Sequence, residues 1–167
     1  MASVYKGISA AECERLYEAA KLPVHIRAHC RAVGELSAHM AESLNQKGYC
    51  LNVELCRDGG YLHDICRLSG HHEKAAGVFL REHGYPQLAE VAERHRGFDE
   101  EEPQTVCKEW VIVCLADKLV QEDQRVTLEE RYRKALEMET VKERIVRDIR
   151  ILKKLLEEYE VITGERF

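Results

Sequence analysis

The chain has 167 residues, of which 45% are hydrophobic and 33% are charged, and its formal net charge is −5. This length suits one domain with a sizeable core, and the composition is that of a globular protein, not a disordered or membrane-spanning one. No run approaches the roughly 20 apolar residues that span a bilayer. The acidic balance argues against a nucleic-acid backbone as the main partner, because that contact needs clustered Lys and Arg. It leaves room for a small phosphorylated substrate.

The cysteines and the N-terminal segment indicate a reducing compartment. Seven cysteines, an odd number, are present without a CxxC pair. This is typical of reduced thiols and not of a disulfide framework or a thiolate zinc site. Residues 1–21 lack the apolar core of a signal peptide. We therefore expect a cytoplasmic protein with no part in a membrane.

Helix signals follow one another along the chain. Ser9, with Glu12 three residues later, predicts a capping box at the start of a first helix. Pro23 opens a second helix that runs to about Gln46, because Gly48 ends that region. Further helices are expected at about 52–65, from 69–70 to about 83, at 86–95 and at about 105–121, with a turn at "GYP" (84–86) and a surface loop at "RGFDEEEP" (96–103).

The remaining residues predict one long charged helix from Thr127 onward, with a break near 139–141. The final "YEVITGERF" is not assigned to a strand. No repeat, low-complexity tract or linker divides the chain. The sequence therefore predicts an all-α fold in a single domain, residues 1–167, built as a helical bundle with a long C-terminal helix.

Asp117 is the most informative polar residue, because it lies on a helix face that should be apolar. Cys114, Val113 and Trp110 precede it by three, four and seven residues and so share its face. A buried carboxylate is too costly to persist ionised unless a metal ion or a cation compensates it. A metal site is one interpretation, and an ion pair with a core Arg or Lys, such as Lys118, is the other.

Three histidines repeat this pattern, since His29, His72 and His95 each share a helix face with apolar residues. Any one of them alone would more often be a core histidine bonded to a carbonyl. His71 and His72 cannot both point inward, because neighbours diverge on a helix, and His72 has the richer apolar face.

The stretch "GYLHDICRLSGHH", residues 60–72, adds the adjacent pair His63 and Asp64. Side chains of helix neighbours point about 100° apart, so ordinary packing has little use for this pair. Gly59 and Gly60 cost helix propensity but let another helix approach closely. Four imidazoles and two carboxylates can then meet in one interior, where such ligands suit zinc, iron, manganese or nickel.

These residues resemble the HD superfamily of metal-dependent phosphohydrolases, whose pattern is a histidine early in one helix, an HD doublet at the end of the next and a distant aspartate. Here "HCRAV" supplies His29, "YLHDI" supplies His63 and Asp64, and "LADKLV" supplies Asp117. The resemblance covers roughly residues 23–121, which it marks as the metal-binding core. Residues 122–167 lie outside it as a helical extension that packs on the core or forms a dimer.

The segment "HEKAAGVFLREHGYPQLAEVAERH" is similar to the version of the pattern with two more histidines, H…HD…H…H…D, which fall on His72 and His95. This version implies one or two divalent ions (Fe, Mn, Zn, Ni, Co or Mg), with Asp64 as a bridging ligand. The common "HDIGK" is "HDICR" here, so Cys66 replaces the glycine and Arg67 keeps a cation in place of the lysine.

The resemblance implies a hydrolase in which a metal-activated water cleaves a phosphate ester or anhydride. The branch includes symmetrical dinucleoside-tetraphosphate hydrolases among others, so a nucleotide-like substrate is implied without its identity. Asp64, Arg67 and Glu73 are the candidate catalytic residues, with Arg67 as a phosphate contact and Glu73 as a support for a ligand or as a base. Plain surface charge is the alternative for Arg67 and Glu73.

The sequence suggests less specific roles for several other polar residues. Arg27, Arg31 and Lys118 are alternative cations for the substrate. His25 either lines the pocket or merely begins its helix. The surface or an edge is the expected place for His39 and His83.

Two further function classes stay open at this point. One is a regulatory module that keeps the metal with little turnover, although a scaffold has no reason to bury so many costly polar groups. The other is a helical interaction domain based on the long helix at 127–160.

Overall fold

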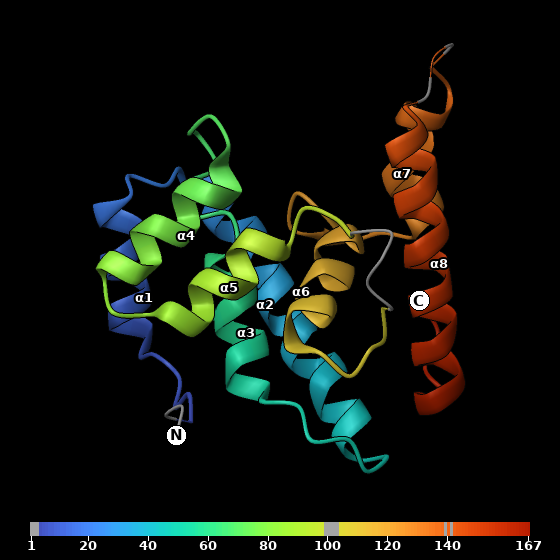
Figure 1. Cartoon of the computed structure of the whole chain (residues 1–167), viewed down its shortest axis with the longest axis horizontal. Coiled ribbons are helices and arrows are strands. Elements are labelled where there is room, and N and C mark those ends of the chain that lie inside the picture. The colour runs from blue at the N-terminus through green and yellow to red at the C-terminus, as the bar shows by residue number, and fades with distance from the viewer. Residues whose placement is uncertain (1–3, 99–103, 139, 141) are drawn as a thin grey trace.

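The computed structural model describes residues 4–98, 104–138, 140 and 142–167, and the fold is all-α apart from one small hairpin (Figure 1). In chain order the elements are α1 (Ala10–Ala19), α2 (Val24–Asn45), α3 (Val53–Leu62), α4 (His72–Glu82), α5 (Pro86–Arg94), α6 (Glu109–Lys118), β1 (Val120–Gln121), β2 (Gln124–Arg125), α7 (Leu128–Leu136) and α8 (Glu143–Thr163). None of the helices within the described ranges is long and apolar enough to cross a membrane.

Helix α6 is the centre of the larger core. It packs against α2, α3, α5 and α8 (Figure 1), so every residue from Trp110 to Asp117 is buried. A second cluster joins α1 to α4 and α5 through Leu16, Leu80 and Leu88, all nearly inaccessible to solvent. Because α6 is enclosed, any polar side chain on it must find its partner inside the protein.

Helices α2 and α3 cross where both carry glycine. A Cβ added to Gly60 would lie 2.5 Å from the Cα of Gly34, so the two backbones are in direct contact. This contact brings the C-terminal end of α3 against α2, and it explains why the doublet is preceded by residues with poor helix propensity.

Several expected boundaries differ from the structure. The third helix ends at Leu62, so the doublet lies in the turn that follows it, and the fourth begins only at His72. His71 precedes it in a left-handed conformation, with φ of 49°. At the first helix the Ser9 side chain accepts from the Glu12 N–H, but the Glu12 carboxylate turns to Arg15 and leaves the capping box half formed.

The sixth helix is shorter than expected and is followed by a hairpin that the sequence did not predict. Val120 pairs with Arg125 and Gln121 with Gln124. The two-residue turn places Glu122 at a φ of 56°. Glycine or asparagine usually occupies such a position, so "VQEDQRV" does not carry the usual hairpin signal.

The long C-terminal helix is two helices. A capping box at Thr127 and Glu130 begins α7, which ends at Leu136, and α8 begins at Glu143. Of the break predicted near 139–141, residues 139 and 141 lie outside the described residues, as do residues 99–103 of the predicted surface loop.

Candidate metal centre

His63 and Asp64 meet the rest of the site from the turn after α3. The His63 ring is fully buried, and its Nδ1 lies 2.6 Å from the carbonyl oxygen of Gly60. A carbonyl can only accept, so Nδ1 must carry the proton and donate it. In the neutral ring Nε2 then presents its lone pair to the interior.

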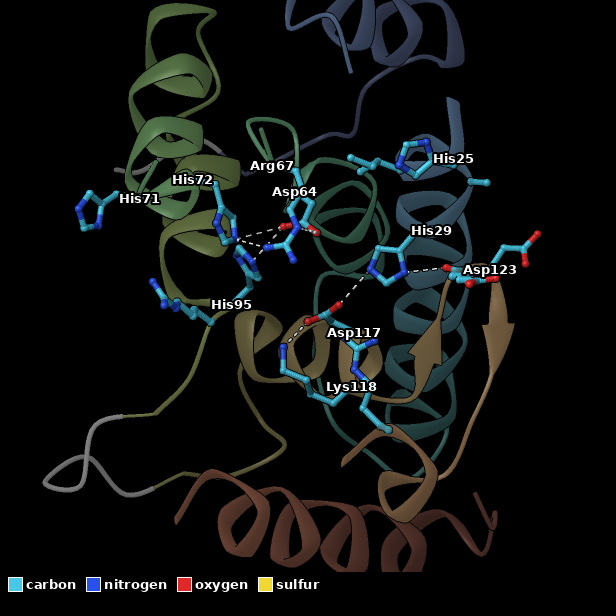
Figure 2. Close-up of a pocket in the computed structure, with 15 residues that line it drawn as sticks. His25, His29, Asp64, Arg67, His71, His72, His95, Asp117, Lys118 and Asp123 are labelled. Carbon is cyan, nitrogen blue, oxygen red and sulfur yellow. Dashed lines mark hydrogen bonds and ion pairs between the residues drawn. The ribbon is translucent and has the colours of Figure 1, made fainter. Parts of the chain in front are cut away.

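His29 projects from α2 toward the same point. Its Nδ1 donates to the backbone carbonyl of Glu122 in the hairpin turn at 2.8 Å, and its Nε2 lies 3.1 Å from Asp117 Oδ1. Figure 2 shows the contact between His29 and Asp117, and the same Asp117 oxygen is 3.5 Å from His63 Nε2. Three elements, α2, α6 and the turn after α3, therefore bring their side chains together.

His72 and His95 approach Asp64 from its other side. His95, at the end of α5, donates from Nδ1 to the carbonyl of Ala92 at 2.6 Å, and its Nε2 lies 3.4 Å from Asp64 Oδ1. His72, the first residue of α4, places its Nε2 at the same distance, 3.4 Å, from that oxygen. His71 is exposed and points away from the others (Figure 2).

The Asp64 carboxylate thus lies between two groups of imidazoles. Its Oδ2 faces His63 at 3.6 Å, whereas its Oδ1 faces His72 and His95. Within each of two groups, His29–His63–Asp64 and Asp64–His72–His95, the potential ligand atoms lie within 4.8 Å of one another. One carboxylate shared by two groups is the arrangement expected of a bridging ligand.

The residues present fit divalent ions. His63 Nε2 and Asp64 Oδ1 are buried and have no hydrogen-bond partner. Imidazole lone pairs and carboxylate oxygens that face each other repel unless a cation lies between them. Ligand bonds of about 2.0–2.2 Å, as zinc makes to nitrogen and oxygen, suit ligand atoms separated by the observed 3.1–3.6 Å. Donation from Nδ1 to a carbonyl is also the usual support of a metal-bound histidine.

The carboxylates and imidazoles of the site stabilise each other's charged forms. Burial by itself would raise the pKa of Asp64, but His63 and His95 hold the pKa of this carboxyl well below its usual range. Burial would likewise lower the pKa of His63, whereas Asp64 and Asp117 raise it. The carboxylates are therefore ionised at neutral pH and attract positive charge, whether from protons or from metal ions.

The two oxygens of Asp117 have different partners in the structure. Its Oδ1 faces His29 and His63, while its Oδ2 pairs with the ammonium group of Lys118. Despite burial, Lys118 and the two histidines hold the pKa of Asp117 well below its usual range. Lys118 therefore neutralises a candidate ligand instead of standing free for a substrate.

Arg67 and Glu73 lie at the edge of the site. Arg67 lines the pocket, 3.8 Å from Asp64 Oδ2 and 3.3 Å from His72 Nε2. Glu73 Oε1 accepts from Arg96 at 2.8 Å, and its Oε2 faces His72 Nδ1 at 3.5 Å. Although burial raises it, the backbone N–H at the start of α4 and Arg96 lower the pKa of Glu73 to about 2. Such a carboxylate is a weak base near neutral pH, so its position favours support of His72.

The other candidate residues divide between the pocket and the surface. His25 lines the pocket (Figure 2), whereas Arg27 and Arg31 both pair with Glu14 and stack near Tyr17. His39 is half-exposed, and His83 stacks on a neighbouring ring at the end of α4. All seven cysteines are free thiols, four of them buried, and none lines the pocket.

Sequence reasoning missed four charged residues that line the pocket: Arg96, Glu122, Asp123 and Arg131. Only the position of Arg96 could have been predicted from the sequence, because it directly follows the candidate ligand His95. The other three follow the end of α6 and reach the pocket through the hairpin and α7. The cavity has a volume of about 1110 Å³, and five of the six candidate ligands line it, all except the fully buried His63.

Comparison with known proteins agrees with this geometry. The model of the HD domain family matches residues 26–121. An uncharacterized protein of Methanocaldococcus jannaschii is 45% identical over 73 residues, which are 41% of this chain and 43% of that protein, so the match spans less than half of the relative. No solved structure matches the chain. Because the family model covers more than half of the residues, the chain belongs to the HD domain family, whose members are in general metal-dependent hydrolases.

Proposed function

We propose that the protein is a metal-dependent phosphohydrolase that cleaves a phosphate ester or anhydride of a nucleotide-like substrate. The observation that carries this proposal is Asp64, whose two oxygens face separate groups of imidazole nitrogens in a buried site. Membership of the HD domain family supports the hydrolase class. The substrate is the finer part of the proposal.

The candidate ligands form two metal sites that share one carboxylate. His29, His63 and Asp117 would hold one ion, His72 and His95 a second, and Asp64 both. Divalent ions bound there would activate a water molecule and neutralise charge on the phosphoryl oxygens.

Arg67 supplies a cation at the open side of the same site. It is half-exposed beside Asp64, so its guanidinium can turn toward a phosphate oxygen without leaving the pocket. The backbone carbonyls of Gly60, Ala92 and Glu122 keep three imidazoles in one orientation throughout.

The pocket favours a substrate larger than a phosphate group. Its volume of about 1110 Å³ is comparable to sites that hold whole cofactors or small molecules. Carboxylates of Glu122 and Asp123 line it beside the cations, which suits a small molecule with both hydroxyl and phosphate groups better than a continuous phosphate backbone.

The proposal is tested by metal analysis and a panel of phosphoesters and phosphoanhydrides, each assayed with Mn²⁺, Co²⁺, Ni²⁺ and Fe²⁺. We expect purified protein to bind metal and to hydrolyse at least one substrate. Asp64→Ala should reduce turnover to background while the circular dichroism spectrum stays helical, because many apolar contacts support the fold. Glu82→Ala, which removes an exposed carboxylate at the end of α4 that neither lines this pocket nor belongs to a ligand group, is the control and should keep its activity.

Two results would contradict the proposal. Full turnover by metal-saturated Asp64→Ala protein would place the chemistry elsewhere. Metal binding without hydrolysis of any substrate would instead favour the regulatory module, which keeps the same ligands with little turnover.

A further inference from the structure

Four cations line the pocket, and three of them already have carboxylate partners. Arg67 lies near Asp64, Arg96 pairs with Glu73 at 2.8 Å, and Lys118 pairs with Asp117. Arg131 differs: among the residues that the structure describes, no carboxylate lies within ion-pair distance of its guanidinium, although the residue is only partly exposed. A partly desolvated guanidinium without a counter-ion is a strong site for an anion.

Arg131 also enters the pocket from a different direction than Arg67. It projects from α7, beyond residues 26–121 that match the family model. It also lines a second cavity of about 350 Å³, which shares Glu122 with the first and in which three cations, Arg131, Arg133 and Lys134, outnumber the carboxylates of Glu122 and Glu130. Arg67, by contrast, contacts Asp64 and His72 at the metal ligands.

We infer that Arg131 binds a second phosphate group of the substrate, beyond the one that is cleaved, and so selects compounds with at least two phosphates. This inference rests on the proposed function. A phosphate at Asp64 lies beside Arg67, whereas a phosphate further along the substrate would meet Arg131, which lines both cavities. The guanidinium fork suits this task because it can donate two parallel hydrogen bonds to one phosphate.

Binding of two inert probes tests the inference without turnover. Methylenebisphosphonate carries two phosphonate groups and methylphosphonate carries one, and calorimetry measures the affinity of Mn²⁺-loaded protein for each. We expect Arg131→Ala to weaken bisphosphonate binding about 10- to 100-fold, as expected for lost hydrogen bonds between charged groups, and to change methylphosphonate binding less than about twofold.

Two more variants make the result specific. Arg131→Lys keeps the charge but loses the fork, so it should recover only part of the affinity. Arg150→Ala removes an exposed cation of α8 that lines neither cavity and should bind both probes as the parent does. Thermal unfolding of each variant shows that the fold is retained.

The outcomes of these binding experiments separate the role of Arg131 from the proposed enzymatic function. Equal losses for both probes, no loss for either, or no binding of bisphosphonate by the parent protein would overturn the role of Arg131. If the probes are discriminated as expected but no phosphate compound is hydrolysed, the proposed enzymatic function fails and the anion site stands. If turnover is found without discrimination, only the inference on Arg131 fails.

Discussion

Three of the four candidate histidine ligands are held by a backbone carbonyl on their Nδ1 side. The Nδ1 atoms of His63 and His95 each donate to a carbonyl three residues earlier, in the helix that the histidine follows, and the Nδ1 of His29 donates to a carbonyl of the hairpin turn. His72 is the exception, because its Nδ1 faces the carboxylate of Glu73 instead. At the scale of the residue, the Nδ1 side of His72 therefore depends on one side chain.

This dependence makes Glu73 testable. We expect Glu73→Ala to weaken binding of one of two metal equivalents about 10- to 100-fold, the usual cost of removing a group that supports a ligand. Glu73→Gln should have a smaller effect, since its amide oxygen can still accept from His72. The measurement is a calorimetric metal titration, with Glu82→Gln at the exposed far end of α4 as the control. Unchanged affinity in Glu73→Ala would mean that Glu73 serves only Arg96.

At the scale of elements, the crossing of α2 and α3 sets the distance between the first histidine and the doublet. Gly34 and Gly60 allow backbone contact there. The carbonyl of Gly60 is also the acceptor that orients His63. Close packing of the helices and orientation of a candidate ligand therefore depend on the same residue.

Gly60→Ala tests this crossing. The new Cβ would lie 2.5 Å and 2.6 Å from backbone atoms of Gly34, which cannot move as a side chain would. We expect a loss of at least about 1–3 kcal/mol in the free energy of unfolding, the usual cost of overpacking, together with weaker metal binding. Gly70→Ala, where a Cβ meets nothing within 4 Å, should change stability by less than about 0.5 kcal/mol. Denaturant unfolding measures both variants, and equal stabilities would show that the crossing adapts.

At the scale of the whole molecule, hydrogen bonds of the C-terminal residues link α8 to α2. The Glu165 carboxylate accepts from the hydroxyl groups of Tyr159 at 2.5 Å and Ser43 at 2.7 Å, and it lies 3.1 Å from His39 Nε2. Tyr159 and Leu155 belong to the same core as α6. The extension is thus packed on the metal-binding core, and α7 is held where Arg131 reaches the pocket.

The hydrogen bonds of the Glu165 carboxylate predict a pH-dependent contribution to stability. Burial would raise the pKa of Glu165, but the hydroxyl groups of Tyr159 and Ser43, together with His39, lower it. A lowered folded-state pKa stabilises the protein above the ordinary glutamate value of about 4.3, and this contribution is lost as the pH falls below that value.

We therefore expect Glu165→Gln to cost about 1 kcal/mol at pH 7 and progressively less as the pH falls from about 5 toward about 3. Urea unfolding across this range measures the difference, with the exposed Glu157→Gln on α8 as the control. If the difference in the free energy of unfolding between variant and parent does not change with pH, the ionised carboxylate is not what links the C-terminus to α2.

Part of this architecture is local and was readable without the structure. Helix starts at Ser9, Pro23 and Thr127 follow from caps and from the fixed φ of proline, which act within one turn. The polar residue on each apolar face, Asp117 above all, follows from helical periodicity, because the neighbours that share its face are three to seven residues away. These signals predicted an all-α fold and identified the residues that meet inside it.

The rest depended on residues far apart in the chain. The carbonyl that orients His29 belongs to Glu122, a separation of 93 residues, in a turn whose sequence carries no hairpin signal. Asp64 faces two groups because a turn, not a helix, carries it, and Arg131 meets the pocket because α8 packs on α2 and α6 and holds its neighbour α7 in place. The sequence by itself determined which side chains had to be buried with partners. Only the tertiary structure decided which partners they found, because that choice depends on how close two helices can approach.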